Sequence, residues 1–147
     1  MSNLERKEYV PNYTLREMTK EDVEEVVKFW KLNYKITNRE TPERLLIFLD
    51  KNRGLSTIAE KDGKKIAVAL GYFTGRKGGV EMVAVDKKHR GNGIGREIVM
   101  YTVEKLLDVG ALDIRLFCEP DLVVFYEKCG FELVEDDYIQ MRIKKYR

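Results

Sequence analysis

The stretch HRGNGIGR at residues 89–96 decides the fold of this 147-residue chain. It follows an apolar, strand-like run at residues 80–85 and opens an amphipathic, helix-like segment that lasts to about Val109. Because glycine has no Cβ, a glycine-rich strand-to-helix turn lets the backbone come close to a ligand. The first amides of a helix have no internal partner and lie at the positive end of its dipole, so such a turn binds phosphate readily. The stretch therefore predicts a site for a cofactor that bears a pyrophosphate.

Glycine spacing narrows the kind of cofactor. The P-loop pattern G-x-x-x-x-G-K-[ST] is absent from the sequence, which argues against a nucleotide hydrolase. The dinucleotide fingerprint G-x-G-x-x-G is half met, because Gly91 and Gly93 fit but the third glycine would fall on Arg96. That fingerprint is also expected near the start of a repeated βαβ fold, whereas this turn lies past the middle of the chain. A dinucleotide-binding fold is therefore not favoured.

The pattern Arg90-x-x-Gly93-x-Gly95 instead resembles the acetyl-CoA signature [RQ]-x-x-G-x-[GA] of the GNAT (Gcn5-related) N-acetyltransferase superfamily. Two flanking runs strengthen the resemblance. MVAVD at residues 82–86 precedes the turn, and FYEKCGF at residues 125–131 resembles the family's Tyr-Glu-Lys-x-Gly-Phe motif. The alternative is a plain helix-start turn whose glycines serve packing, but the order of the two motifs favours the family.

Size and composition are those of one domain with a substantial core. The chain is 44% hydrophobic with a net charge of +2, so nothing points to a nucleic-acid or membrane partner. Its two cysteines, Cys118 and Cys129, make no disulfide framework, and residues 1–10 lack the apolar stretch of a signal peptide. No run approaches the roughly 18 apolar residues of a membrane span. We therefore expect a cytoplasmic protein.

Hydrophobic periodicity and turn residues predict strands and helices downstream of a loose segment at residues 1–12. Strands are expected at residues 13–18, 56–60, 65–74, 80–85, 114–118, 131–134 and 139–143, and helices at residues 20–32, 42–52, 95–109 and 121–129. Asp62-Gly63 is a hairpin signal, and Thr19-x-x-Asp22 resembles a capping box. This order predicts a single α/β (α+β) domain at residues 13–147, with a mixed sheet and helices on both faces. It matches the GNAT fold, which the resemblance implies as a mostly antiparallel central sheet of about seven strands.

Moving an acetyl group from a thioester to an amine requires that the cofactor is held, the amine deprotonated, and the oxyanion and leaving thiolate stabilised. The resemblance implies acetyl-CoA as the cosubstrate, with no metal. It assigns the pyrophosphate to the turn and the pantetheine arm to the main chain of the central strand, one amide of which would point at the thioester oxygen. The turn residues are Arg90, Gly91, Asn92, Gly93, Ile94, Gly95 and Arg96, and the strand residues are Val83, Ala84 and Val85.

Tyr126 and Glu81 are the candidate catalytic residues. By resemblance Tyr126 donates a proton to the leaving thiolate, which a phenol with a pKa of about 10 can do, and the alternative is a core aromatic. Glu81 lies on the central strand, where many relatives carry a glutamate that acts as the base, and the alternative is a surface carboxylate. His89 could act as the base by its pKa, but it sits beside the phosphate turn. Family members often carry an asparagine where this chain has Glu119, so the chain departs from the family there.

These observations predict an acetyl-CoA-dependent N-acetyltransferase, an acyltransferase of EC class 2.3.1, that moves an acetyl group to a primary amine by direct attack in a ternary complex. One alternative is acetylation of a protein or peptide N-terminus or lysine. Another, from a different class, is an acyl-CoA-binding sensor without turnover. The acceptor is expected to be a small-molecule or peptide amine, set in relatives by the loop at residues 34–40 and by the last hairpin. Relatives are often dimers, so a homodimer is one expectation.

Overall fold

Among the residues that the structure describes, one sheet of five strands, in the order β1-β2-β3-β4-β5, forms the centre of the molecule. The computed structural model describes residues 12–144, so the predicted loose segment lies outside the described residues except for Asn12. The strands are β1 (Thr14–Glu17), β2 (Thr57–Lys61), β3 (Lys64–Phe73), β4 (Lys77–Val85) and β5 (Asp113–Arg115). The helices are α1 (Val23–Asn33), α2 (Pro42–Lys51), α3 (Ile94–Asp108) and α4 (Val123–Lys128), with 3-10 turns η2 (Lys20–Asp22), η3 (Lys87–His89) and η4 (Pro120–Leu122). Neighbouring strands run antiparallel except for the β4–β5 pair, which is parallel.

Two local sequence signals form the structures that they predict. The β2–β3 hairpin turns at Asp62 and Gly63, whose φ angles of 52° and 75° are both positive, as a type I′ turn requires. Thr19 and Asp22 form the capping box at the start of η2, where the Asp22 carboxylate accepts a 2.8 Å hydrogen bond from the Thr19 amide. The first helical segment therefore begins where its capping residues indicate.

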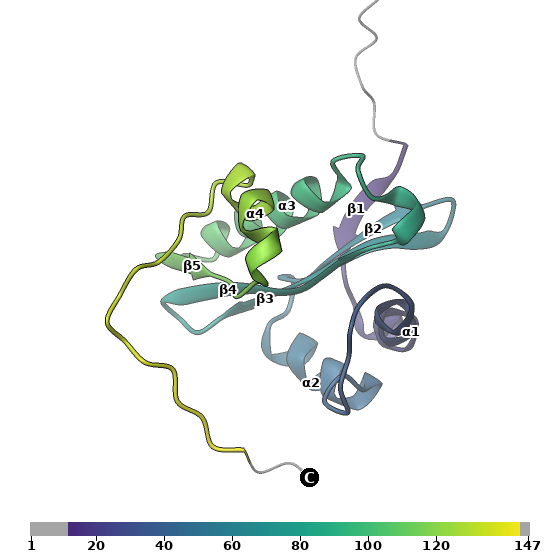
Figure 1. Cartoon of the computed structure of the whole chain (residues 1–147). Helices are drawn as coiled ribbons and strands as arrows, with labels where there is room; N and C mark the ends of the chain where they lie inside the picture. The colour runs from purple at the N-terminus through teal and green to yellow at the C-terminus, as the bar shows by residue number, and fades with distance from the viewer. Residues whose placement is uncertain (1–11, 145–147) are drawn as a thin grey trace, which may run out of the picture.

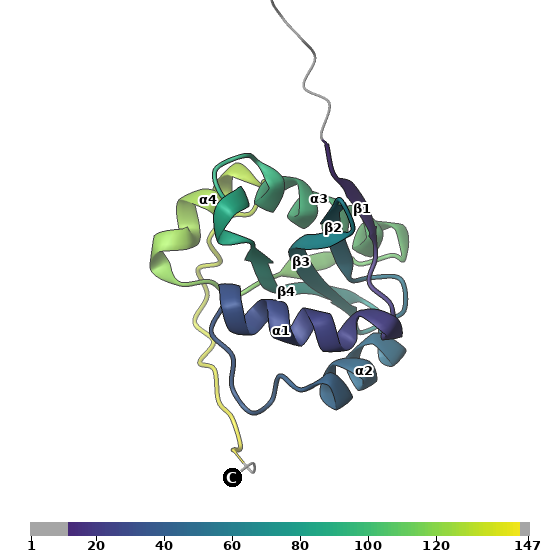
Figure 2. The same ribbon diagram turned by 90° about the vertical axis from the view of Figure 1, so that its right-hand side faces the viewer.

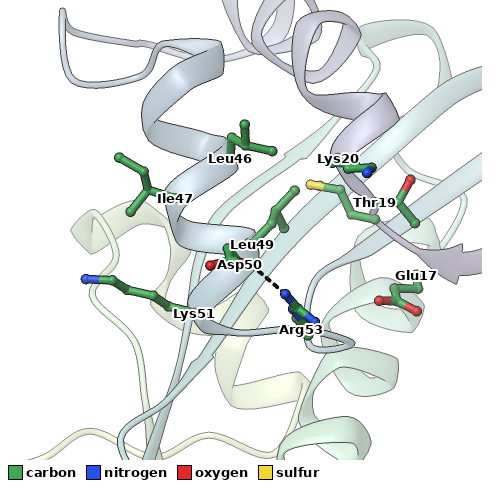
Figure 3. A pocket seen from close by; sticks show the side chains of 10 residues that line it. Glu17, Thr19, Lys20, Leu46, Ile47, Leu49, Asp50, Lys51 and Arg53 are labelled. Atoms are coloured by element: carbon green, nitrogen blue, oxygen red, sulfur yellow. Dashed lines mark hydrogen bonds and ion pairs between the residues drawn. The ribbon is translucent and has the colours of Figure 1, made fainter.

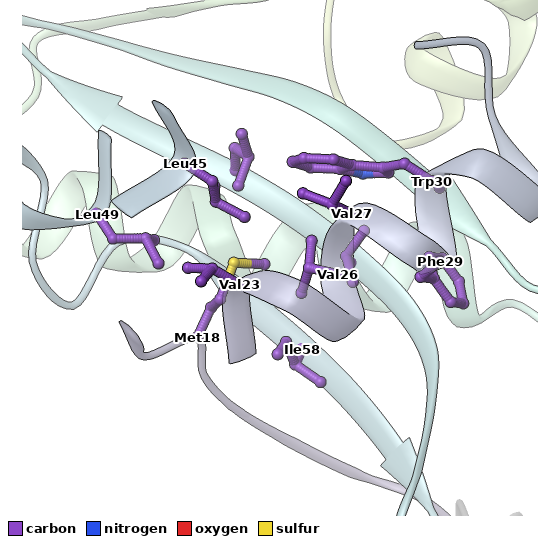
Figure 4. Packing of buried hydrophobic residues seen from close by; sticks show 12 residues of the cluster. Met18, Val23, Val26, Val27, Phe29, Trp30, Leu45, Leu49 and Ile58 are labelled. Carbon is purple, nitrogen blue, oxygen red and sulfur yellow. The ribbon is translucent and has the colours of Figure 1, made fainter. Parts of the chain in front are cut away.

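Helices cover both faces of the sheet. In Figure 1, α1 and α2 lie below it and α3 and α4 above it, and Figure 2 shows α1 crossing the strands with α2 beside it. Apolar residues at helical spacing on α1 join the sheet and α2 in one core cluster (Figure 4). Its buried members are Met18, Val23, Val26, Val27, Phe29, Trp30, Leu45, Leu49, Ile58, Val68, Leu70 and Ala84. On the other face, Ile94 and Ile98 of α3 pack against Ile66 and Ala67 of β3. The predicted class, a mixed and mostly antiparallel sheet between two helical layers, is confirmed.

Strands β4 and β5 diverge after a short parallel pairing. Residues 77–79 of β4 pair with β5, and β4 then continues to Val85 with no strand on that side within residues 12–144. The strand predicted at residues 114–118 is therefore shorter than expected and begins one residue earlier, because only the start of this segment reaches β4. The free edge of β4 at residues 80–85 presents backbone groups that no neighbouring strand pairs with.

The strands predicted at residues 131–134 and 139–143 do not form, so the sheet of the described chain has five strands instead of about seven. Residues 131–144, here called the C-terminal arm, pass outside β5 and away from the sheet (Figure 1). An ion pair joins the arm to β5, with 3.9 Å between Arg115 Nη1 and Asp136 Oδ2. Alternating apolar residues favour a strand, but a strand is stable only when another strand pairs with it and an apolar face is covered. Among residues 12–144 of the single chain, the arm has no such partner strand.

Both cysteines are free, with Cys118 exposed and Cys129 buried. Within residues 12–144, no helix is long and apolar enough to cross a membrane. In the same range, no group of three or more histidine, cysteine and acidic residues is arranged to hold a metal ion.

Candidate active site

The glycine turn between β4 and α3 has the backbone that its sequence predicts. Gly91 and Gly93 have φ angles of 86° and 79°, a left-handed conformation that glycine adopts at little cost. Gly93 is the N-cap of α3, and it has no side chain that could accept from the first amides of the helix. The helix is 15 residues long, so the dipole at its start is well developed. The turn is therefore suited to bind an anion.

The Arg90 side chain braces this turn against β4 and α1. Its Nε donates to the Val85 carbonyl at 3.1 Å, and its Nη2 donates to the Asn33 carbonyl at 3.0 Å. The Asn33 side chain accepts from the Lys87 amide at 3.1 Å, so the end of α1 is tied to the chain on both sides of His89. Arg90 thus holds the shape of the turn through its side chain. Asn33 was missed from the sequence, because its partner lies 57 residues away and no local signal marks it.

Residues Val83, Ala84 and Val85 lie on the free edge of β4, as their assignment to a cofactor arm requires. Ala84 is buried, and the two valines are half-buried. Just before them the register with β3 shifts, and Met82 has a positive φ of 53°. A bulge of this kind redirects backbone groups and is frequent beside active sites. An extended pantetheine arm fits this edge, because it could pair with the exposed backbone as an added strand does.

Tyr126 lies on α4, which packs against the start of α3. Its half-buried ring meets Phe125 and Phe131 edge-on, with centroids 4.9 and 6.0 Å away. Gly95 allows this approach, since a Cβ there would lie 3.2 Å from Phe125 Cζ. Burial, with a smaller effect from Cys118, raises the pKa of Tyr126 to about 12. The hydroxyl is therefore protonated at neutral pH, as a proton donor must be.

Glu81 lies in the middle of β4 and keeps exposed surface. Loss of part of its hydration, followed by the Glu40 carboxylate, raises the pKa of Glu81, while Arg39 lowers it. Burial and the charge of Glu81 also raise the pKa of Tyr72, on the neighbouring strand β3. A carboxylate is a better general base when its pKa lies closer to the working pH. The surroundings of Glu81 thus change it in the direction that a base requires.

Three carboxylates, one of them on β4, raise the pKa of a single tyrosine. Burial, and then the charges of Glu119, Glu40 and Glu81, raise the pKa of Tyr34. We call these four residues the acidic mouth. Tyr34 is also among the groups that raise the pKa of Tyr126, so charges in the loop at residues 34–40, on the central strand and on α4 lie within electrostatic range of one another. Tyr34 and Glu40 were missed as individuals, because the sequence indicates only the loop that carries them.

Two other features are not part of the acidic mouth. His89 is in η3, where its Nδ1 is 3.4 Å from Asp86 Oδ2, on the turn itself. A pocket of about 660 Å³ opens between α2 and the end of β1 and is lined by residues such as Leu46, Leu49 and Lys20 (Figure 3). None of the candidate site residues lines it, so this pocket is not the candidate active site.

Comparisons with known proteins agree with this arrangement. Residues 15–131 match the family model described as acetyltransferase (GNAT) family. A stretch of 57 residues is 44% identical to glucosamine 6-phosphate N-acetyltransferase 1 of rice, Oryza sativa subsp. japonica; it covers 39% of this chain and only 34% of that protein's length. The crystal structure of glucosamine-6-phosphate N-acetyltransferase from Arabidopsis thaliana is similar with a TM-score of 0.65 and 23% identity, over 91% of this chain and 99% of that one. An aminoglycoside N-acetyltransferase in complex with CoA has a TM-score of 0.66 and 17% identity, over 88% of this chain and 94% of that one.

At these identities the solved structures establish the fold alone. The family model adds the sequence evidence, because its match contains the free β4 edge, the glycine turn and α4, and it ends where the C-terminal arm begins. The chain therefore belongs to the acetyltransferase (GNAT) family.

Proposed function

We propose that this protein is an acetyl-CoA-dependent N-acetyltransferase that acetylates a primary amine by direct attack in a ternary complex. One observation carries the proposal: an anion-binding helix start, with left-handed Gly91 and Gly93, follows directly on a strand with an unpaired edge. A pyrophosphate and an extended arm are the two recognition elements of CoA, and they need these two surfaces side by side. The cytoplasmic location remains a prediction from the sequence.

In the proposed reaction the chain supplies three functions, and acetyl-CoA supplies the acetyl group as a thioester. Backbone groups of residues 83–85 orient the pantetheine arm, and one amide donates to the thioester oxygen as negative charge develops on it. Glu81, directly or through a water, takes a proton from the attacking amine. Tyr126 gives its proton to the departing sulfur. An acceptor that arrives as an ammonium ion first loses one proton to the solvent, because only the neutral amine attacks. The N–C bond forms as the C–S bond breaks; afterwards Glu81 releases its proton to the solvent and Tyr126 regains one from it, so the reaction balances without a redox or metal step.

The acidic mouth supports an acceptor that is positively charged in solution. Glu40, Glu81 and Glu119 all act on Tyr34, and such a cluster attracts a protonated amine to the site by its field. The rice relative is named for glucosamine 6-phosphate, a molecule that carries both an amine and a phosphate. The three carboxylates oppose that phosphate, whereas Arg39 near Glu81 offers it one cation. We therefore rank amines without a phosphate first, and keep the amino-sugar phosphate and peptide amines as alternatives.

The test is release of free CoA thiol from acetyl-CoA with a panel of acceptors: glucosamine 6-phosphate, polyamines, simple primary amines, and peptides with a free N-terminus or lysine. We expect release that depends on an acceptor, with mass spectrometry showing one added acetyl group. Calorimetry with CoA runs in parallel on the same preparation. Binding of CoA without turnover for any amine would favour the acyl-CoA sensor, and no binding of CoA would remove the proposal altogether.

We also propose that the C-terminal arm joins two copies of this chain. Six large apolar side chains of the arm are 57–89% exposed, which is a larger apolar surface than a monomer usually leaves in water. They are Leu133, Val134, Tyr138, Ile139, Met141 and Ile143. The arm alternates as a strand does, and the outer edge of β5 has no strand partner among the described residues. Each chain thus carries both an unpaired arm and an unpaired β5 edge. Two copies can therefore exchange arms about a two-fold axis, with each arm pairing with the β5 edge of the other copy.

The oligomeric state tests this assignment. Sedimentation velocity over a range of concentrations should give a dimer for the full chain, and the double variant Ile139→Glu/Met141→Glu should shift it to a monomer. Leu32→Glu is the matched control, because Leu32 is 72% exposed but lies on α1, and it should stay dimeric. A wild-type monomer at every concentration would contradict the exchange of arms between two copies.

A further inference from the structure

Met82 occupies a strained backbone position inside the central strand. In the described chain, the non-glycine residues with positive φ are Asp62, in the hairpin turn, and Met82, in β4. Leu70 of β3 pairs with Glu81, but Val68 pairs with Ala84, so β4 carries one residue more than β3 over this stretch. The bulge therefore lies at residues 82–83, directly before the backbone groups assigned to the thioester. An L-residue in the left-handed region is disfavoured and persists only where its surroundings hold it.

Trp30, on helix α1 in the adjacent layer, holds this backbone position. Its indole Nε1 donates a hydrogen bond to the Met82 carbonyl at 3.3 Å, across 52 residues of sequence. The side chain is 1% exposed and lies in the core between α1 and the sheet (Figure 4), where Met82 packs against the same cluster. A buried indole N–H needs an acceptor, and the carbonyl at the bulge is that acceptor. The contact thus joins the core under α1 to the backbone of the bulge.

We propose that Trp30 is a positioning residue: by holding the Met82 carbonyl it fixes the β4 bulge and thereby the direction of the backbone amides of residues 83–85. The inference rests on the proposed function, which assigns those amides to the pantetheine arm and the thioester oxygen. Hydrogen-bond donors stabilise an oxyanion only in a narrow geometry. A bulge that relaxes toward regular extended backbone would turn these amides away while the fold and the phosphate turn remain.

The test first removes the indole N–H of Trp30 and then relieves the backbone strain at Met82 that the N–H is proposed to hold. Trp30→Phe keeps an aromatic ring in the core but cannot donate, and we expect kcat to fall at least about tenfold while the KM for acetyl-CoA stays within about twofold. Replacement of Trp30 by 3-benzothienylalanine, in which sulfur stands for N–H, tests the same bond without loss of volume. The double variant Trp30→Phe/Met82→Gly should recover most of kcat, because glycine adopts a φ of 53° without the hold.

A second readout does not depend on turnover. In NMR spectra of the free protein, the amide signals of Val83 and Ala84 should shift in Trp30→Phe and return toward wild type in the double variant. Phe29→Leu is the control for packing, since Phe29 is 8% exposed in the same cluster on the same helix. It should lower the melting temperature and leave kcat and those two amide signals in place.

The outcomes separate this inference from the proposed function. Unchanged amide signals and unchanged kcat in the benzothienyl protein would overturn the role of Trp30, as would a double variant no better than Trp30→Phe. If wild type turns over no amine, the proposed function fails, yet the NMR comparison still decides whether Trp30 holds the bulge. If Phe29→Leu lowers kcat as much as Trp30→Phe, core packing accounts for the effect and the inference is wrong.

Discussion

Tyr126→Phe should lower kcat by about 10²–10⁴-fold, the range that a general acid contributes, with little change in the affinity for CoA. The variant keeps the half-buried ring and its edge-on contacts with Phe125 and Phe131, and it removes the hydroxyl alone. The pKa of about 12 means that this hydroxyl carries its proton across the working range, so it can donate to a thiolate as that forms. A matching fall in kcat/KM would mark an interaction made only in the transition state.

Steady-state kinetics with the preferred amine, beside calorimetry with CoA, is the measurement. Tyr101→Phe is the control, because Tyr101 is also half-buried but lies on α3 beside Lys105, and its kcat should stay near wild type. The dependence of kcat on pH is a second measurement, and its direction can be predicted. A raised pKa at Glu81 means that kcat falls as acid protonates this base, from a pH above the usual range of a glutamate. That acidic limb should persist in Tyr126→Phe. Turnover within about twofold of wild type, with chemistry rate-limiting, would make Tyr126 a core aromatic.

Gly93→Val should weaken CoA binding at least tenfold, about 1.4 kcal/mol, while the protein stays folded. Apart from its own residue and chain neighbours, a Cβ at Gly93 would have no protein atom within 4 Å, so it would project into open space at the turn. The valine also sits in a left-handed conformation with φ of 79°, which costs of the order of 1–3 kcal/mol of folding free energy. The loss of affinity has two sources: the side chain blocks the approach of the pyrophosphate, and strain shifts the amides that bind it.

Gly63→Val is the control for the loss of stability that a valine causes in a left-handed backbone conformation. Gly63 has a φ of 75° and equally open space, but it lies in the turn of the β2–β3 hairpin and not in the glycine turn before α3. Both variants should lose similar stability in thermal unfolding, and only Gly93→Val should lose affinity for CoA in calorimetry. Equal CoA affinity in the two folded variants would remove the pyrophosphate from this turn.

The fold and the candidate site contain features that the sequence predicts and features that it does not. The glycine turn, the hairpin at Asp62 and the start of α1 were predicted because each depends on residues adjacent in sequence. Asn33 and Trp30 were missed, although they hold Arg90 and Met82 from α1, because each partner lies more than fifty residues away. The two C-terminal strands were predicted wrongly for a related reason. Alternating apolar residues indicate which face a strand would bury, but they do not show whether another strand is available to pair with it.

By itself, the sequence determined the order of the elements, the left-handed glycines before α3 and the motifs that assign the family, because these depend on local backbone preferences and residue spacing. Only the tertiary structure decided that β5 leaves β4 after three pairs, that β4 bulges at Met82, and that Glu40 and Glu119 come near Glu81 and Tyr34. The register between strands and the partners of buried polar groups depend on contacts between segments far apart in the chain. Such contacts form only when the whole core packs at once, so no local pattern encodes them.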